Sequence, residues 1–388
     1  MKSSVILKGF SAVLPPYHRP QEEGFDWLVE AHARAAASSE GREDSLEKWR
    51  GRISRMVRRY HCAAEHIGRR RSNLEDFMHT DWRRMEIFNL LESPQGKGLA
   101  ARSRFYAETA NRVVEELFAG DIEPPSDLLH VSCTGYVSPS PVQRLIGLKR
   151  WHDRTLATQV YHMGCYAAVP AIRVAAGLLQ CGSSKVERRA EIVHTELCTL
   201  HFNPLDHSPE QLIVQSLFAD GHIRYAMVPL DAPRDDHGTG GLELLAVREE
   251  MVPDSLEDMT WVLSDWGFRM TLSRDVPGRV AAALPGFLAN LFAAAEHDYP
   301  EKAAETVFAV HPGGPRIIDE VAELLGLRED QLALSRAVLF ERGNMSSATL
   351  PHIWMAAAAD PNVKAGTLVA SLAFGPGLTI AGALFRKC

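Results

Sequence analysis

The stretch YHMGCYAAVPAIRVAAGLL, residues 161–179, joins a strand end, a glycine turn and an apolar helix around one cysteine. Gly164 permits a tight turn, and the following helix is apolar almost all round, which is typical of a buried central helix. Such a turn projects Cys165 at a helix N-terminus, where the macrodipole lowers a thiol pKa. The pattern favours Cys165 as a nucleophile, although a cysteine before an apolar helix is more often structural.

Strand-like and helix-like segments alternate on both sides of this stretch. Further strands are expected at residues 4–14, 128–133, 190–194, 266–272, 307–310, 367–373 and 379–385, and further helices at 276–297, 317–324 and 346–359. Alternation in two halves predicts an α/β architecture with mixed sheets between helical layers. The segment PRDDHGTGG, residues 233–241, is the best candidate seam. It divides the chain into residues 1–235, which carry the cysteine, and residues 236–388.

The composition excludes several classes of protein. The 388 residues are 46% hydrophobic and 23% charged, which is ordinary for a globular protein, and the net charge of −7 argues against a nucleic-acid binder. No uninterrupted apolar run is long enough to span a bilayer, so no membrane span is expected. Six cysteines without a CxxC pair argue against a metal site and a disulfide framework, and indicate a cytoplasmic location.

Two polar side chains in the second half could complete a site around the thiol. His311 stands where the apolar strand FAV ends and the loop PGGP begins, and Asn344 lies at a turn before a helix. Each has an ordinary structural interpretation when taken singly, as a satisfied histidine or a turn asparagine. Together, the imidazole could stabilise Cys165 as a thiolate, and imidazole and amide N–H groups could donate to a thioester oxygen as it becomes an enolate.

Four segments carry a family resemblance. They are GCYAA at residues 164–168, VHPGGPRIID at 310–319, GNMSS at 343–347 and AFGPGLTIAGALF at 373–385. In this order they resemble the type III polyketide synthases, the chalcone-synthase-like enzymes of the thiolase superfamily. SCTGYVSPS at residues 132–140, LFADG at 217–221 and LSRDVPG at 272–278 are weaker matches, and the first is more similar to bacterial members.

The resemblance implies a thiolase-like duplicated αβαβα fold with mixed five-stranded sheets. It also implies a homodimer and no metal or redox cofactor. The implied reaction is decarboxylative condensation of malonyl-CoA with an acyl-CoA starter, followed by cyclisation to a pyrone or resorcinol. By motif position, Cys165 is the nucleophile, and His311 and Asn344 serve decarboxylation and the enolate.

The same resemblance implies a substrate pocket. Phe218 falls on an aromatic gatekeeper of the family, and Met270 replaces a second one. Cys198 and His201 stand where plant enzymes have polar threonines, and the closing motif adds Phe374 and Gly375. These departures favour an aliphatic starter over an aromatic one.

A cluster of arginines precedes the first conserved motif. In the family this region contacts the phosphates of coenzyme A, and guanidinium groups suit phosphate because each offers a planar fork of donors. A solvated helix face and a docking surface for an acyl carrier protein are the alternatives. The candidate residues are Arg58, Arg59, Arg69, Arg70 and Arg71.

Two other functions stay open. A stand-alone ketosynthase that condenses or joins carrier-bound acyl chains would use the same three residues, and dependence on a carrier would distinguish it. A catalytically silent partner subunit usually loses its nucleophile or its imidazole, and both are present here.

Overall fold

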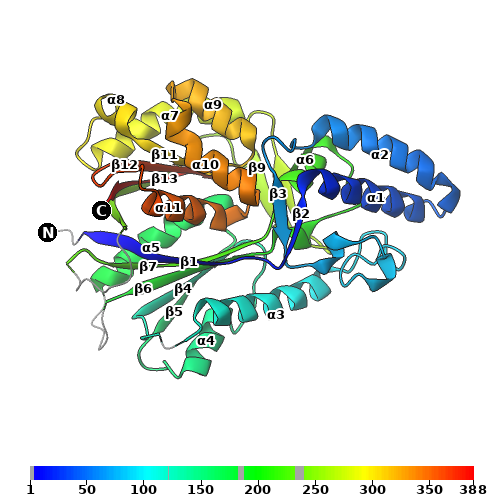
Figure 1. The fold of residues 1–388 in the computed structure, drawn as a ribbon, viewed down its shortest axis with the longest axis horizontal. Coiled ribbons are helices and arrows are strands. Elements are labelled where there is room, and N and C mark those ends of the chain that lie inside the picture. The colour runs from blue at the N-terminus through cyan, green and yellow to red at the C-terminus, as the bar shows by residue number, and fades with distance from the viewer. Residues whose placement is uncertain (1–3, 121, 182–187, 232–239) are drawn as a thin grey trace.

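The computed structural model describes residues 4–120, 122–181, 188–231 and 240–388 as helical layers around a large sheet (Figure 1). The sheet has nine strands in the order β11-β12-β13-β8-β1-β7-β6-β4-β5. The strands from the first half are β1 (Val5–Val13), β4 (Asp127–Ser132), β5 (Leu156–Tyr161), β6 (Ala190–Glu196) and β7 (Gly221–Pro229). Those from the second half are β8 (Leu242–Met251), β11 (Val307–Val310), β12 (Leu368–Gly375) and β13 (Thr379–Lys387).

The two halves repeat one topology. Outward from β1 the pairings are antiparallel to β7, antiparallel to β6 and parallel to β4. Outward from β8 they are antiparallel to β13, antiparallel to β12 and parallel to β11. The expected duplicated layered fold is therefore confirmed. The sheets differ in detail from the expectation, because β1 pairs with β8 and joins five strands and four strands into one sheet.

Helices α5 (Ala168–Cys181) and α11 (Thr349–Ala359) form the middle layer. Each contacts strands of both halves, so most of each helix surface is buried. This explains why both are apolar nearly all round: Ala171 and Ile172 of α5, and Ile353 and Trp354 of α11, are completely buried.

Two outer layers cover the remaining faces of the sheet. On one side are α3 (Leu99–Leu117) and α4 (Pro141–Lys149), and on the other are α7 (Val276–Ala293), α8 (Tyr299–Lys302), α9 (Pro315–Leu325) and α10 (Glu329–Arg342). Helix α7 is long and apolar enough to cross a membrane by length and composition alone. Its buried face, which includes Phe287 and Leu291, packs on β13 and β8 as a core helix does.

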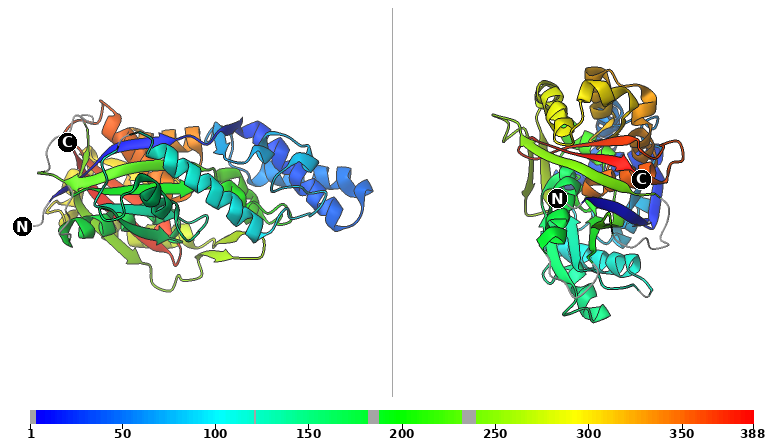
Figure 2. Two further views of the ribbon diagram at one scale, coloured as in Figure 1. Left: turned by 90° about the horizontal axis from the view of Figure 1, so that it is seen from below. Right: turned by 90° about the vertical axis from the view of Figure 1, so that its left-hand side faces the viewer.

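The N-terminal segment adds a part that is not repeated in the second half. Helices α1 (Gln21–Ser39) and α2 (Leu46–Tyr60) pack together at the end of the molecule away from both termini (Figures 1 and 2), and α2 also contacts α6 (Pro209–Leu217). The short strands β2 (Tyr17–Pro20) and β3 (Arg69–Ser72) pair beneath them, and β9 (Met259–Leu263) and β10 (Phe268–Leu272) form a separate hairpin. The expected seam, residues 233–241, and its boundary at 235 and 236 fall largely on residues 232–239, which lie outside the described residues.

Candidate active site

Cys165 lies between β5 and α5, in a 3₁₀ turn at Gly164–Tyr166. Gly164 has a φ of 80°, which favours glycine, and a Cβ added there would lie 2.6 Å from Cδ of Pro376. Glycine is therefore required both by the turn and by the close approach of the loop between β12 and β13. The result is a half-buried thiol at the carboxyl end of a strand.

The thiol is protonated in the resting site. Burial raises the pKa of Cys165 to about 12, while the hydroxyl of Ser346, 3.7 Å from the sulfur, lowers it. This corrects the expectation that the helix N-terminus lowers the thiol pKa. Cys165 precedes α5 by three residues, and desolvation outweighs the dipole at this position.

Asn344 is held by its backbone against one segment of the first half, residues 217–219. Its N–H donates to the carbonyl of Leu217 at 2.9 Å, and its own carbonyl accepts from the N–H of Ala219 at 2.8 Å. The side-chain Oδ1 accepts from the backbone N–H of Ser346 at 2.9 Å. The other end of the amide, Nδ2, is buried and has no hydrogen-bond partner among the described residues.

His311 directly follows β11, and its N–H donates to the carbonyl of Leu372 on β12 at 2.7 Å. The side chain is buried, and neither ring nitrogen has a hydrogen-bond partner in the described part of the chain. Burial lowers the pKa of His311 to about 3, so the imidazole is neutral at physiological pH. An imidazolium–thiolate pair with Cys165, which the sequence suggested, is therefore not formed in this resting state.

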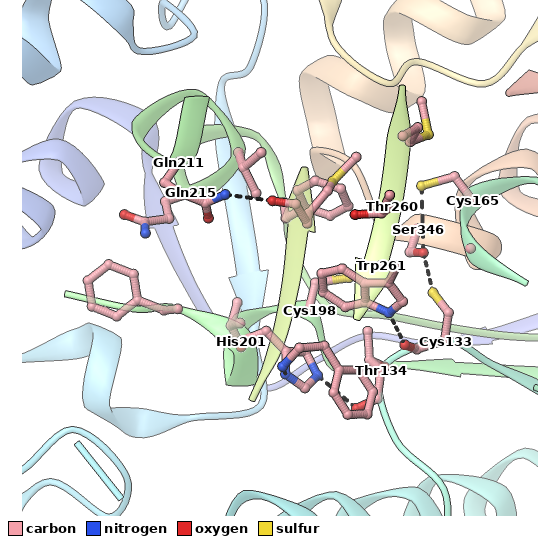
Figure 3. Close-up of a pocket in the computed structure, with 18 of the residues that line it drawn as sticks. Cys133, Thr134, Cys165, Cys198, His201, Gln211, Gln215, Thr260, Trp261 and Ser346 are labelled. Carbon is pink, nitrogen blue, oxygen red and sulfur yellow. Dashed lines mark hydrogen bonds between the residues drawn. The ribbon is translucent and has the colours of Figure 1, made fainter. Parts of the chain in front are cut away.

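Ser346 connects the two loops of the site. Its hydroxyl lies 3.7 Å from the sulfur of Cys165 (Figure 3). Its backbone N–H donates to Oδ1 of Asn344. A buried polar group without a partner costs about 1–3 kcal/mol, so the unpaired nitrogens of His311 and Asn344 are expensive unless a ligand uses them.

Cys165 opens on a cavity whose wall is mainly apolar. Of the expected pocket residues, Phe218, Met270, Cys198 and His201 lie on this wall. Phe374 and Gly375 do not, which corrects the expectation: Phe374 is buried in the core behind the cavity, and Gly375 packs against the ring of Tyr166. Other lining residues include Leu28, Arg70, Phe77, Cys133, Thr134, Phe202, Gln211, Val214, Gln215, Thr260, Trp261, Phe268, Ser346 and Pro376.

Comparison with known proteins places this site in a family. Residues 243–388 match the model of the C-terminal domain of chalcone and stilbene synthases. A 1,3,6,8-tetrahydroxynaphthalene synthase of Streptomyces coelicolor is 30% identical over 264 residues, which is 68% of this chain and 66% of that one. The chain belongs to the type III polyketide synthase family. The type III polyketide synthase pspB of Penicillium soppii is 28% identical over 76% of this chain and 80% of its own.

A solved structure supports the fold of this polyketide synthase. The C-terminal type III polyketide synthase domain of Steely1 from Dictyostelium superposes with a TM-score of 0.79, at 21% identity, over 99% of both chains. The duplicated layers are thus the thiolase-like fold of that domain. Family membership makes the protein an enzyme that forms carbon–carbon bonds by polyketide condensation.

The β9–β10 hairpin forms one wall of the cavity of this polyketide synthase. The indole N–H of Trp261 donates to the carbonyl of Cys133 at 2.7 Å. His201 accepts from the N–H of Phe268 at Nδ1, so its Nε2 must carry the proton that it donates to the carbonyl of Thr134 at 2.8 Å. The hairpin is therefore fixed to the first half by side chains, and both ring nitrogens of His201 form hydrogen bonds that connect the two parts.

The arginines separate into two kinds. Arg70 reaches inward, where it donates to Oε1 of Gln21 and to the carbonyls of Gln215 and Phe218. Burial lowers its pKa to about 10. This corrects the expectation that Arg70 is a surface contact for coenzyme A. Arg71 is half-buried and donates to the carbonyl of Pro15 at 3.1 Å, whereas Arg58, Arg59 and Arg69 are exposed.

Sequence reasoning missed part of the site. Ser346 and Cys133 stand inside motifs that were recognised, but their side chains had no assigned role. Glu196 is buried at the end of β6 and accepts hydrogen bonds from the N–H of Cys133 and the hydroxyl of Thr134. The one available signal was an acidic residue at the end of an otherwise buried strand. Trp261 belongs to a hairpin that the sequence pattern did not resolve into two strands.

Proposed function

We propose that this polyketide synthase condenses malonyl-CoA with an aliphatic acyl-CoA starter through a thioester on Cys165, and releases a pyrone- or resorcinol-type product. The observation that carries the proposal is the set of buried nitrogens without partners on His311 and Asn344. Hydrogen-bond donors held in place before the reaction stabilise charge that develops in the transition state.

Each step uses these groups in a defined way. The sulfur of Cys165 attacks the starter thioester, an acyl–sulfur bond forms, and coenzyme A leaves as the thiol. Malonyl-CoA then loses carbon dioxide and becomes an enolate, whose oxygen accepts from Nδ2 of Asn344 and from the N–H of neutral His311. The enolate carbon attacks the acyl group on Cys165, which releases the thiolate and leaves a chain two carbons longer on coenzyme A. No metal or redox cofactor takes part.

The character of the cavity supports an aliphatic starter. Leu28, Phe77, Phe202 and Val214 extend the apolar wall toward α1 and α6. An apolar acyl chain gains about 0.8 kcal/mol for each methylene group that it buries there. The rings of Trp261 and Phe268 also line the cavity and take up space in it, which disfavours a bulky aromatic starter. We expect Trp261→Ala to accept longer acyl-CoA starters than the unchanged protein does.

The mode of delivery is the second point of the proposal. Arg58 and Arg59 on α2 are exposed and make no ion pair with a described carboxylate, so they can meet the phosphates of coenzyme A. The same charges favour the alternative of a ketosynthase supplied by an acidic acyl carrier protein. We also propose a homodimer, because β5 is an open edge of the sheet with Leu156 exposed. We propose a cytoplasmic location, because no disulfide joins the cysteines that the structure describes.

The test uses labelled malonyl-CoA with a panel of acyl-CoA starters of different lengths, aromatic ones included, and mass spectrometry of the products. Cys165→Ala and His311→Ala serve as controls. Products from aliphatic CoA esters that require Cys165 support the proposal, and exclusive use of aromatic starters contradicts the aliphatic pocket. Turnover only with carrier-bound chains supports the ketosynthase, and no turnover in either case supports a silent partner subunit.

A further inference from the structure

A second thiol lies beside the nucleophile, and the condensation steps proposed above do not use it. Cys133 follows β4 at once, and Cys165 follows β5 by four residues; β4 and β5 are parallel neighbours in which Ser132 pairs with Tyr161. Because parallel strands end at the same edge of a sheet, this topology brings both cysteines to one place. Both are free thiols, and both line the cavity.

One hydroxyl stands between the two sulfurs. Oγ of Ser346 lies 2.7 Å from Sγ of Cys133 and 3.7 Å from Sγ of Cys165 (Figure 3). The separation of the sulfurs therefore cannot exceed the sum of these distances. A change of side-chain rotamer, together with a small displacement of Ser346, is the movement that sulfur–sulfur contact requires.

The second thiol also has an acceptor for its proton. Sγ of Cys133 donates to Oε1 of Glu196 at 3.4 Å, and the carboxylate is completely buried. Burial raises the pKa of Glu196, which favours uptake of a proton by this carboxylate. A thiol next to a base is the arrangement that activates a cysteine for attack.

We propose that Cys133 is the resolving thiol of a peroxide-sensitive pair with Cys165. In the first step Cys165 is oxidised by hydrogen peroxide to a sulfenic acid, and one water leaves. In the second step the sulfur of Cys133 attacks that of Cys165, and the carboxylate of Glu196 takes the thiol proton. The hydroxyl of the sulfenic acid leaves with a proton as a second water, and a disulfide bond forms. Two thiols and one peroxide thus give one disulfide and two waters.

The modification would protect the nucleophile. A sulfenic acid without a nearby thiol is oxidised further to a sulfinic acid, which reducing agents do not reverse, whereas a disulfide is restored by dithiothreitol. Because burial raises the pKa of Cys165, its reaction with peroxide at neutral pH is slow, and the experiment needs excess peroxide. The inference rests on the proposed role of Cys165 only where activity is measured.

The test treats the purified full-length protein with hydrogen peroxide and follows its mass, which does not depend on turnover. We expect loss of two hydrogens, a Cys133–Cys165 cross-linked peptide in a non-reducing digest, and recovery of free thiols and activity with dithiothreitol. In Cys133→Ser, which keeps a hydroxyl for the bonds to Ser346 and Glu196, we expect Cys165 to gain two oxygens and activity to stay lost.

Two further variants decide which thiol resolves the oxidised cysteine. Cys198 also lines the cavity, and Cys181 is exposed at the end of α5. Recovery in Cys198→Ser and Cys181→Ser should equal that of the unchanged protein. Equal recovery in Cys133→Ser, or a cross-linked peptide that contains Cys198 in place of Cys133, overturns the proposal. An enzyme inactive in every assay that still forms the Cys133–Cys165 bond would refute the proposed function and leave this inference standing.

Discussion

The two halves of the molecule carry opposite kinds of buried polar group. From the first half, the carboxylate of Glu196 accepts from the N–H and thiol of Cys133 and from the hydroxyls of Thr134 and Ser347. From the second half, His311 and the amide nitrogen of Asn344 are just as buried, yet have no partners among the described residues. A satisfied network holds a shape, whereas unsatisfied donors raise the energy of the empty site and lower that of a bound anion.

The largest effect is expected where the donors are unpaired. Replacing His311 by alanine should reduce the rate of malonyl-CoA decarboxylation by about 10²–10³-fold, because one donor to the enolate is lost. His311→Gln, which keeps an N–H donor, is the matched control and should retain part of the rate. Equal loss in both variants would count against a donor role.

Substitutions in the hydrogen-bond network of Glu196 should lower the free energy of unfolding. Glu196→Leu leaves the buried N–H of Cys133 and the hydroxyls of Thr134 and Ser347 without their acceptor, so the free energy of unfolding should fall by about 3 kcal/mol. Urea denaturation followed by circular dichroism measures it. Glu196→Gln keeps one acceptor oxygen and should cost less. A leucine variant as stable as the unchanged protein would show that this network does not hold the site together.

Arg70 and Arg58 differ in the same way, because Arg70 is hydrogen-bonded inside the fold and Arg58 is exposed. Arg70→Ala removes hydrogen bonds to Gln21 and to the carbonyls of Gln215 and Phe218, and should lower the free energy of unfolding by about 2 kcal/mol. Exposed Arg58→Ala should change stability by less than about 0.5 kcal/mol but raise the KM for acyl-CoA. Thermal denaturation and initial rates measured on the same two variants separate these roles. A raised KM for acyl-CoA with unchanged stability in Arg70→Ala would instead assign Arg70 to substrate binding.

A further effect concerns acid. Burial lowers the pKa of His352 in α11 to about 3, whereas an unfolded chain titrates near its ordinary value of about 6.5. Below that value the unfolded state binds a proton that the folded state excludes, so stability falls as the pH drops from about 6.5 toward 3. His352→Leu should flatten this slope by about 1.4 kcal/mol per pH unit. Denaturation at several pH values measures it, and an unchanged slope in His352→Leu would contradict the prediction.

Local patterns in the chain were enough for much of the fold. The strand at Val307–Val310 was predicted to the residue, and the helix that begins at Val276 was predicted with its correct start. Hydrophobic periodicity works there because one face of each element packs on the sheet. It failed at β8 and β9, which are only partly buried and show no clear alternation, whereas β10 lies within the strand expected at residues 266–272.

The motifs located Cys165, His311 and Asn344 in the chain, but not their state. A motif lists residue types in order, and the protonation of a thiol depends on how much water the surrounding fold removes. Phe374 and Gly375 also show that a motif does not fix where a side chain lies. They belong to a recognised motif, yet the strand carries them behind the cavity, and the next residue, Pro376, lies on its wall.

The sequence by itself determined the alternation of elements, the family and the three residues of the proposed chemistry, because these depend on side-chain type and on spacing along the chain. Only the tertiary structure decided that Arg70 turns inward, that one sheet of nine strands joins the halves, and that Cys133, Ser346 and Glu196 surround the nucleophile. The physical reason is distance along the chain. Cys133 and Ser346 are 213 residues apart in sequence, and only the packing of one half on the other brings them into contact.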